Sequence, residues 1–186
     1  MGFLSRIFGQ HSTPSPEVKQ RQADIHSETD PKYLQAIMSI PTYWKQYEES
    51  LRLIRSTVHC DTYFNRKDFM IARLGLTQQL INYVGGSNTF IDEMTNTDIT
   101  VSSQDIDSIL QDLSSNNYDE QFIKRYSESL FDKVNSLKTP KAQLNNINKW
   151  QQWLLPYENK LSSELAKSFH SYCSGLEKNI TQELNK

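Results

Sequence analysis

One stretch, WKQYEESLRLIRSTV at residues 44–58, decides the fold class of this chain. Its apolar residues recur at spacings of three, four, three and four positions: Trp44, Tyr47, Leu51, Ile54 and Val58. Because an α-helix turns once in about 3.6 residues, this spacing keeps all of them on one face of a helix. The stretch therefore predicts an amphipathic helix whose apolar face packs against other elements.

The segment that follows, CDTYFNRKD at residues 60–68, mixes aromatic and charged residues and predicts a helix start capped by Asp61 or Thr62. The positive charges of Arg66 and Lys67 are unfavourable near the positive end of that helix unless an anionic group lies close to them. The segment thus offers four candidate binding residues for an anion or an acidic partner: Asp61, Arg66, Lys67 and Asp68. A structural salt bridge from Arg66 to Asp61 or Glu49 explains the same pattern, and it is the interpretation that we favour.

Capping residues and apolar spacing predict further helices along the chain. Asp30 and Pro31 start the first, and Pro41 is expected to start the next. Gly85 and Gly86 end a helix that begins near residue 63. The predicted helices cover about 31–40, 41–59, 63–84, 103–113, 119–137, 140–154 and 157–184, with Pro156 interrupting or kinking the chain before the last.

Residues 87–101 are harder to assign. They contain strand-favouring residues, but two short isolated runs would make at best a marginal hairpin. We therefore expect a loop with a turn of helix there. The whole chain is predicted to be all-α, an irregular bundle of five to seven helices with a long C-terminal helix and a flexible N-terminal arm. Residues 1–30 would form an amphipathic tip and a flexible linker, and residues 31–186 a single helical domain.

Composition narrows the function classes. A net charge of -2 and a pI near 6.1 give no global field that would attract nucleic acid. The two cysteines, Cys60 and Cys173, lack the spacing of a disulfide framework, which indicates a reducing cytoplasm. No motif calls for a cofactor. We therefore expect no nucleic-acid partner and no cofactor.

The first nine residues, MGFLSRIFG, contain apolar residues that would share one face of a short helix. They lack the apolar core of a signal peptide, and Arg6 stands where myristoylation of Gly2 would need Ser or Thr. Peripheral membrane binding through residues 1–9 is therefore a further alternative, beside a short segment that folds back onto the body.

Charge is spread unevenly along the chain. Residues 92–120 hold eight acidic residues and no Lys or Arg, whereas residues 32–86 hold seven basic and four acidic ones. Complementary faces that pack together or meet water explain this pattern. The other interpretation is a partner surface, for self-association or for a basic protein.

Four weak metal-ligand candidates and two tryptophans complete the list of candidate residues. Convergence of His59, Cys60, His170 and Cys173 would supply zinc ligands, but each cysteine is more simply a small buried apolar group, so we predict no metal site. Trp150 and Trp153 are three positions apart. They are core residues or, if exposed, binding residues that anchor an interface.

The run DTYFNRKD at residues 61–68, preceded by ESLRLI at 49–54, resembles small helical bacterial proteins of unknown function. Those proteins carry a similar aspartate, threonine, aromatic pair, arginine and aspartate after an amphipathic helix. The resemblance covers about 25 residues, and this chain has Lys67 where an aromatic residue usually follows the arginine. It implies a bacterial, cytosolic origin and no particular activity.

The chain lacks a nucleophile-base pair, a phosphate loop and a metal cage. We therefore predict a non-enzymatic helical interaction or scaffold module, which binds a protein partner or a second copy of itself. The alternative is a small ligand-binding or enzymatic bundle with a polar site near four residues: His59, Asp61, Arg66 and Asp68.

Overall fold

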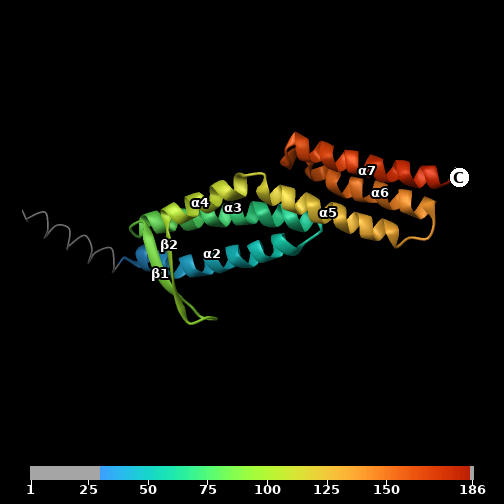
Figure 1. Ribbon diagram of the computed structural model, residues 1–186. Coiled ribbons are helices and arrows are strands. Elements are labelled where there is room, and N and C mark those ends of the chain that lie inside the picture. The colour runs from blue at the N-terminus through green and yellow to red at the C-terminus, as the bar shows by residue number, and fades with distance from the viewer. Residues whose placement is uncertain (1–29, 185–186) are drawn as a thin grey trace, which may run out of the picture.

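The computed structural model describes residues 30–184, which form six α-helices, one short 3-10 helix and a two-stranded antiparallel sheet (Figure 1). The elements are α2 (Pro31–Ser56), α3 (Cys60–Tyr83), β1 (Ser87–Asp92), β2 (Thr97–Ser102), α4 (Ser103–Ser114), α5 (Asn117–Asn135), α6 (Pro140–Leu154), the 3-10 helix η1 (Leu155–Lys160) and α7 (Ser163–Leu184). The predicted helical fold class is confirmed. The predictions for residues 1–29, an amphipathic tip and a linker, lie outside the described residues.

Figure 1 shows an elongated molecule. At one end α2 and α3 lie side by side, α4 runs along the other side of α3, and the β1–β2 hairpin crosses α2. At the other end α6 and α7 pack together on α5. Because α5 contacts α2 and α4 as well as α6 and α7, it joins the two ends.

Where the two ends meet, aromatic side chains from five elements form a group that we call the aromatic junction: Tyr63, Phe64, Phe122, Tyr126, Trp150, Tyr157 and Phe169. Tyr63 stacks on Phe122 with ring centroids 4.0 Å apart. Tyr126 lies 4.6 Å from Trp150. Burial of large rings, with added ring-to-ring attraction, stabilises this contact between the ends.

The helix α2 runs unbroken from Pro31 to Ser56, so the prediction that Pro41 starts a new helix was wrong. An internal proline removes one helical hydrogen bond and normally kinks or ends a helix. Here, however, buried residues lie on both sides of the proline: Ala36, Ile40, Tyr47, Ser50 and Ile54. Packing of this continuous stripe, mostly against α3, outweighs the local cost.

Residues 87–102 form a hairpin, so the expected loop with a turn of helix was wrong. Gly85 and Gly86 end α3 with φ of +110° and +89°, and the Gly86 amide donates to the Ile81 carbonyl at 2.8 Å. In the hairpin, Phe90 pairs with Ile99, and both pack on the hydrophobic core. This packing supplies the stability that an isolated hairpin lacks.

Local signals identified several helix ends correctly. The Asp30 carboxylate accepts the Lys32 amide at 2.8 Å at the start of α2. At the start of α4, Ser102 and Asp105 cap each other reciprocally, and at the start of α6 the Thr139 hydroxyl accepts a backbone amide. These ends depend on neighbouring residues alone, which is why the sequence predicts them.

Two predicted helix starts are shifted. The helix α3 begins at Cys60, with His59 at the cap position, rather than near residue 63. The helix α7 begins at Ser163 rather than at residue 157, because Pro156 lies in the separate 3-10 turn η1. Within residues 30–184, no helix is both long enough and apolar enough to cross a membrane.

Candidate interaction site

The charged residues predicted for binding at residues 61–68 face different neighbours. Lys67 and Asp68 each pair with an oppositely charged side chain from another element. Asp61 and Arg66 instead line an open groove between α3 and α2. This arrangement does not bring the predicted polar site of His59, Asp61, Arg66 and Asp68 together in one pocket.

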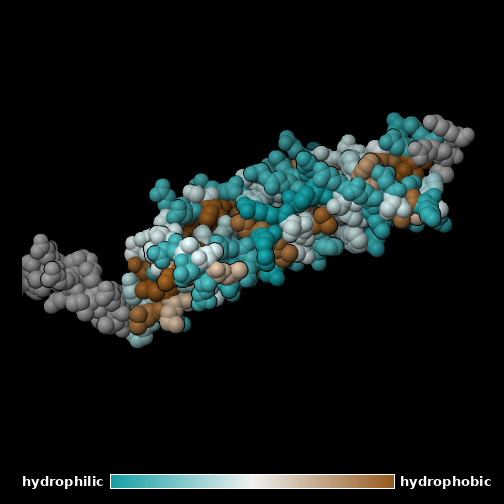
Figure 2. Space-filling view, turned by 60° about the horizontal axis from the view of Figure 1, so that its bottom comes forward, coloured by the Kyte–Doolittle hydropathy of each residue, from teal (hydrophilic) through white to brown (hydrophobic). Residues whose placement is uncertain are grey.

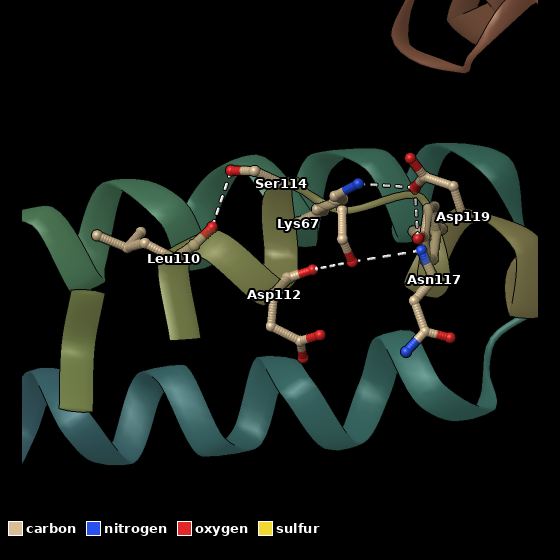
Figure 3. A network of polar contacts seen from close by, with 8 residues as sticks. Lys67, Leu110, Asp112, Ser114, Asn117 and Asp119 are labelled. Carbon is tan, nitrogen blue, oxygen red and sulfur yellow. Dashed lines mark hydrogen bonds and ion pairs between the residues drawn. The ribbon is translucent and has the colours of Figure 1, made fainter. Parts of the chain in front are cut away.

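Lys67 forms an ion pair with a buried carboxylate at the start of α5. Its Nζ lies 2.7 Å from Oδ1 of Asp119, and the Tyr63 hydroxyl donates to the same oxygen at 2.7 Å (Figure 3). The side chains of Lys67 and Asp119 are only 12% and 6% exposed. Since a lone charge buried this far is costly, each group depends on the other. Lys67 therefore has a structural role, which is to hold α5 against α3.

Figure 3 also shows how the chain passes from α4 to α5 beside this pair. The Ser115 hydroxyl donates to the Asp112 carbonyl at 2.6 Å and accepts the Asn117 amide at 3.4 Å. These bonds satisfy backbone groups at the helix ends. They place Asp119 in the first turn of α5, where it meets Lys67.

Asp68 makes a more exposed ion pair with Lys160 at the end of η1. The nitrogen and oxygen are 2.5 Å apart, but the side chains are 37% exposed for Lys160 and 59% for Asp68. Water and salt screen such a pair, so it contributes little to stability. Its contact nonetheless joins α3 to η1, beside the aromatic junction.

Arg66 makes a cation–π contact rather than the expected ion pair. Its guanidinium lies 5.8 Å from the centroid of the Phe69 ring, and the guanidinium of Arg73 lies 5.0 Å from the same centroid. Among the described residues, Arg66 forms no salt bridge to Asp61 or Glu49, so that prediction was wrong. Cation–π contact with the ring holds the charge in place of a carboxylate.

The weak metal candidates do not converge. Within residues 30–184, no three His, Cys, Asp or Glu side chains are placed to hold an ion. Burial raises the pKa of Cys60 to about 11 and that of Cys173 to about 12, so both thiols stay protonated at neutral pH. His170 pairs with Glu158 at 2.7 Å instead.

The two candidate tryptophans have different environments. Trp150 is 9% exposed and belongs to the aromatic junction, where its carbonyl accepts the Tyr126 hydroxyl at 2.7 Å. Trp153 is 45% exposed, with the Lys149 ammonium 4.9 Å from its ring. Trp150 is therefore a core residue, and only Trp153 has the exposure of an interface residue.

A hollow of about 790 Å³ lies between α2 and the hairpin, and we call it the hairpin groove. Residues of α2 form one side, among them Trp44, Lys45 and Arg52. The hairpin forms the other side, with Ile91, Glu93 and Met94 among its residues. Apolar side chains and both signs of charge thus meet in one open depression.

Large apolar side chains are exposed on the hairpin and on α2. Met94 is 85% exposed and Ile91 61% exposed on the hairpin side of the groove, while Met38, 76% exposed, lines a neighbouring hollow of α2. Figure 2 shows apolar surface gathered at the end of the molecule where α2 begins. Exposed apolar side chains that cluster in this way, with polar residues at their edge, are typical of protein-binding surfaces.

Hydrogen bonds fix the turn that presents Met94. The Asp92 carboxylate accepts the Met94 amide at 3.0 Å and the Thr95 hydroxyl at 2.7 Å. These bonds, that from Thr95 above all, hold the pKa of Asp92 below its ordinary value. Asn96 completes the turn with a φ of +52°. Met94 is therefore presented by ordered backbone, which lowers the entropy cost of binding.

The sequence contains local signals for the hairpin. Residues 87–92 alternate between more and less exposed positions, with Phe90 inward and Ile91 outward. Asp92 and Asn96 are residue types that favour turns, and Gly85 and Gly86 precede the first strand. Together they indicate a hairpin. The groove itself depends on where α2 lies relative to the hairpin, which no local pattern gives.

Comparisons with known proteins do not identify the chain. No protein-family model, no curated protein and no solved structure matches it. The resemblance of residues 61–68 to small helical bacterial proteins therefore stays a prediction, and the function has to be argued from the surface just described.

Proposed function

We propose that this protein is a non-enzymatic interaction module that binds a protein partner through the hairpin groove. One observation carries the proposal: Ile91 and Met94 are strongly exposed on an ordered hairpin that faces an open groove on α2. Exposed apolar residues on a fixed backbone can be buried by a partner at little cost in conformational freedom.

The mixed chemistry of the groove supports a protein ligand. Trp44, Ile91 and Met94 supply apolar contact area, and the ring nitrogen of Trp44 is already satisfied by Glu48 at 3.0 Å. Lys45 and Arg52 supply charged donors at the edge. An apolar centre with a polar rim is the usual composition of a protein interface.

The ligand-binding alternative has less support. Lys67 is engaged by Asp119 and Asp68 by Lys160, which leaves Asp61 and Arg66 as the charged residues of the groove that they line. Arg66 in turn lies against Phe69. No acid-base pair acts across that groove in the described residues, so it offers no evident chemistry. Membrane binding through residues 1–9 stays a prediction.

We further propose that the module works in a bacterial cytoplasm. Its two thiols, Cys60 and Cys173, are free and buried, as suits a reducing compartment. The sequence resemblance of residues 61–68 points the same way.

Site-specific photo-crosslinking tests the proposed surface. A photoreactive residue replaces Met94 in the hairpin, and a matched control carries it at Leu155, which is 54% exposed on η1. Illumination in the native host should give a discrete protein adduct from position 94 and none from position 155. No adduct at position 94, or the same adducts at both positions, would contradict binding through the hairpin groove.

A further inference from the structure

The first turns of α2 carry apolar side chains on two opposite faces. Ala36 and Ile40 are buried in the molecule. Leu34 and Met38, by contrast, are 49% and 76% exposed. The members of each pair are four positions apart and the two pairs are offset by two positions, so they lie on opposite sides of the helix. Because a surface helix ordinarily has one apolar stripe, the outer stripe indicates a binding surface.

This outer stripe lines a hollow of about 440 Å³, which we call the outer hollow. Its lining residues run along α2 from Pro31 to Tyr43, and none of them is charged. A charged ligand would lose water in such a hollow without meeting an opposite charge, whereas an apolar segment would gain from burial. The outer hollow therefore fits an apolar segment.

One stretch of the chain itself has matching chemistry. Within residues 1–9, Arg6 is the only charged side chain. Helical spacing would place four apolar residues on one side of this stretch: Phe3, Leu4, Ile7 and Phe8. Contact between this side and the outer hollow would remove large apolar side chains of both from water, at about 25 cal/mol for each Å².

The intervening residues 10–29 are long enough for this contact. A polar linker of about 20 residues has a root-mean-square span of about 25 Å. At 1.5 Å per helical residue, the outer hollow lies within about 20 Å of Pro31. Such a tether gives an effective concentration of about 1 mM, at which a contact with a dissociation constant of about 0.1 mM is formed about nine-tenths of the time. A separate molecule would need a similar concentration to compete.

We propose that the apolar side of residues 3–8 docks in the outer hollow of the same chain, against Leu34 and Met38. The outer hollow adjoins the hairpin groove, since Thr42 lines both. Its apolar stripe is nonetheless a different surface, so the inference does not depend on what the hairpin groove binds. A membrane is the competing partner of residues 3–8, and a second copy is the competing source of the docked segment.

Methionine oxidation tests this contact, because an accessible thioether is converted to the sulfoxide faster than a buried one. The full chain is treated with dilute hydrogen peroxide, and the rate at each methionine is measured by mass spectrometry of its peptides. Met94, 85% exposed, is the accessible reference, and Met70, at 0%, is the buried one. In the wild type, Met38 should oxidise about tenfold more slowly than Met94, because docking would leave it accessible about one-tenth of the time.

Two substitutions form a matched pair. Ile7→Asp places a carboxylate on the apolar side of the segment and should raise the Met38 rate to that of Met94. Ser5→Asp adds the same charge on the opposite side and should leave Met38 protected. Met70 should stay slow in every variant, which verifies an intact core. Because the contact lies within one chain, the rates should be equal at about 1 and 100 μM protein.

Three results would overturn the inference. The first is a wild type in which Met38 oxidises as fast as Met94, which would leave residues 3–8 available to a membrane. The second is protection of Met38 that persists in Ile7→Asp, because something other than the apolar side of residues 3–8 would then cover it. The third is protection that is lost on dilution, since the docked segment would then come from a second copy.

Discussion

The aromatic junction and the hairpin groove lie in one molecule but use their apolar residues differently. In the junction, Tyr63 and Phe122 are fully buried and stacked, and the Tyr63 hydroxyl donates to the Asp119 carboxylate. In the groove, Ile91 projects from β1 and Met94 from the hydrogen-bonded turn, and both remain largely exposed. The apolar side chains of the first region are buried within the chain, whereas those of the second remain exposed to water. Because the backbone that carries the exposed side chains is ordered, the second region points to a partner.

Alkaline pH should disrupt the junction most strongly. Burial raises the pKa of Cys60 from 9.0 to about 11, and burial also raises the pKa of Tyr63 and Tyr126. The folded state therefore binds these protons more tightly than the unfolded state, so their contribution to stability is complete below pH 9.0 and is lost as the pH rises through about 11.

Urea unfolding followed by tryptophan fluorescence measures this effect. The free energy of unfolding should be steady near neutral pH and should fall steeply above pH 9.0, the ordinary thiol value. Equal stability at neutral pH and at a pH of about 11 would contradict the assignment of these groups to a protonated core.

Truncation in the junction should be the most destabilising single substitution. Phe122→Ala removes a fully buried ring that contacts Tyr63, Phe64 and Tyr126, and should lower the free energy of unfolding by about 3 to 5 kcal/mol. Ile91→Ala, at the groove, should change it by less than about 0.5 kcal/mol. Chemical denaturation monitored by circular dichroism compares them, and equal losses would erase the distinction between the two regions.

The two ion pairs of α3 should differ in how much they contribute to the free energy of unfolding. Asp119→Ala leaves the buried ammonium of Lys67 without a partner and should cost about 3 kcal/mol. Asp68→Ala breaks the exposed pair with Lys160 and should cost less than about 1 kcal/mol. Urea denaturation of both variants provides the test. If Asp68→Ala lowered the free energy of unfolding as much as Asp119→Ala, burial would not determine how much each ion pair stabilises the protein.

The boundary between the hairpin and α4 should show an intermediate effect. Ser102→Ala removes the hydroxyl that accepts the Asp105 amide, and should destabilise the protein by about 1 kcal/mol. Ser108→Ala, at an exposed position inside α4, is the matched control and should be nearly neutral. Thermal unfolding at one protein concentration distinguishes them, and indistinguishable melting temperatures would argue against the cap.

Met94→Ser should have the smallest effect on folding. The side chain is 85% exposed, so its loss should change the free energy of unfolding of the monomer by less than about 0.5 kcal/mol. Binding through the groove should weaken in contrast, since the side chain supplies apolar contact. Urea denaturation, beside photo-crosslinking with the photoreactive residue at position 91 instead, separates the two quantities. A large loss of monomer stability would place Met94 among the folding residues instead.

The parts of the fold that were predicted correctly depend on near neighbours. Asp30, Ser102 and Thr139 cap helices through bonds to amides two or three residues ahead, so each can be identified from a short window. The stripe at residues 44–58 similarly predicts α2 because helical spacing is a local property.

The parts that were missed depend on residues far apart in the chain. Lys67 pairs with Asp119, which lies 52 positions later in the sequence, and no pattern near Lys67 predicts that pairing. The hairpin is stabilised by packing of Phe90 and Ile99 on the core, which outweighs its weak local preference. The continuity of α2 through Pro41 likewise depends on packing against α3. Candidate residues could therefore be named from the sequence, but not which of them remain accessible.

Pro41 adds a further property to the groove that it lines. Because proline has no amide hydrogen, the carbonyl of Ile37, four residues earlier, loses the helical donor that it would otherwise have. The pyrrolidine ring crowds that oxygen, so α2 lacks one bond of its own ladder where it lines the groove, and its continuity there depends on packing against α3. Pro41→Ala would restore the internal bond and should raise the free energy of unfolding.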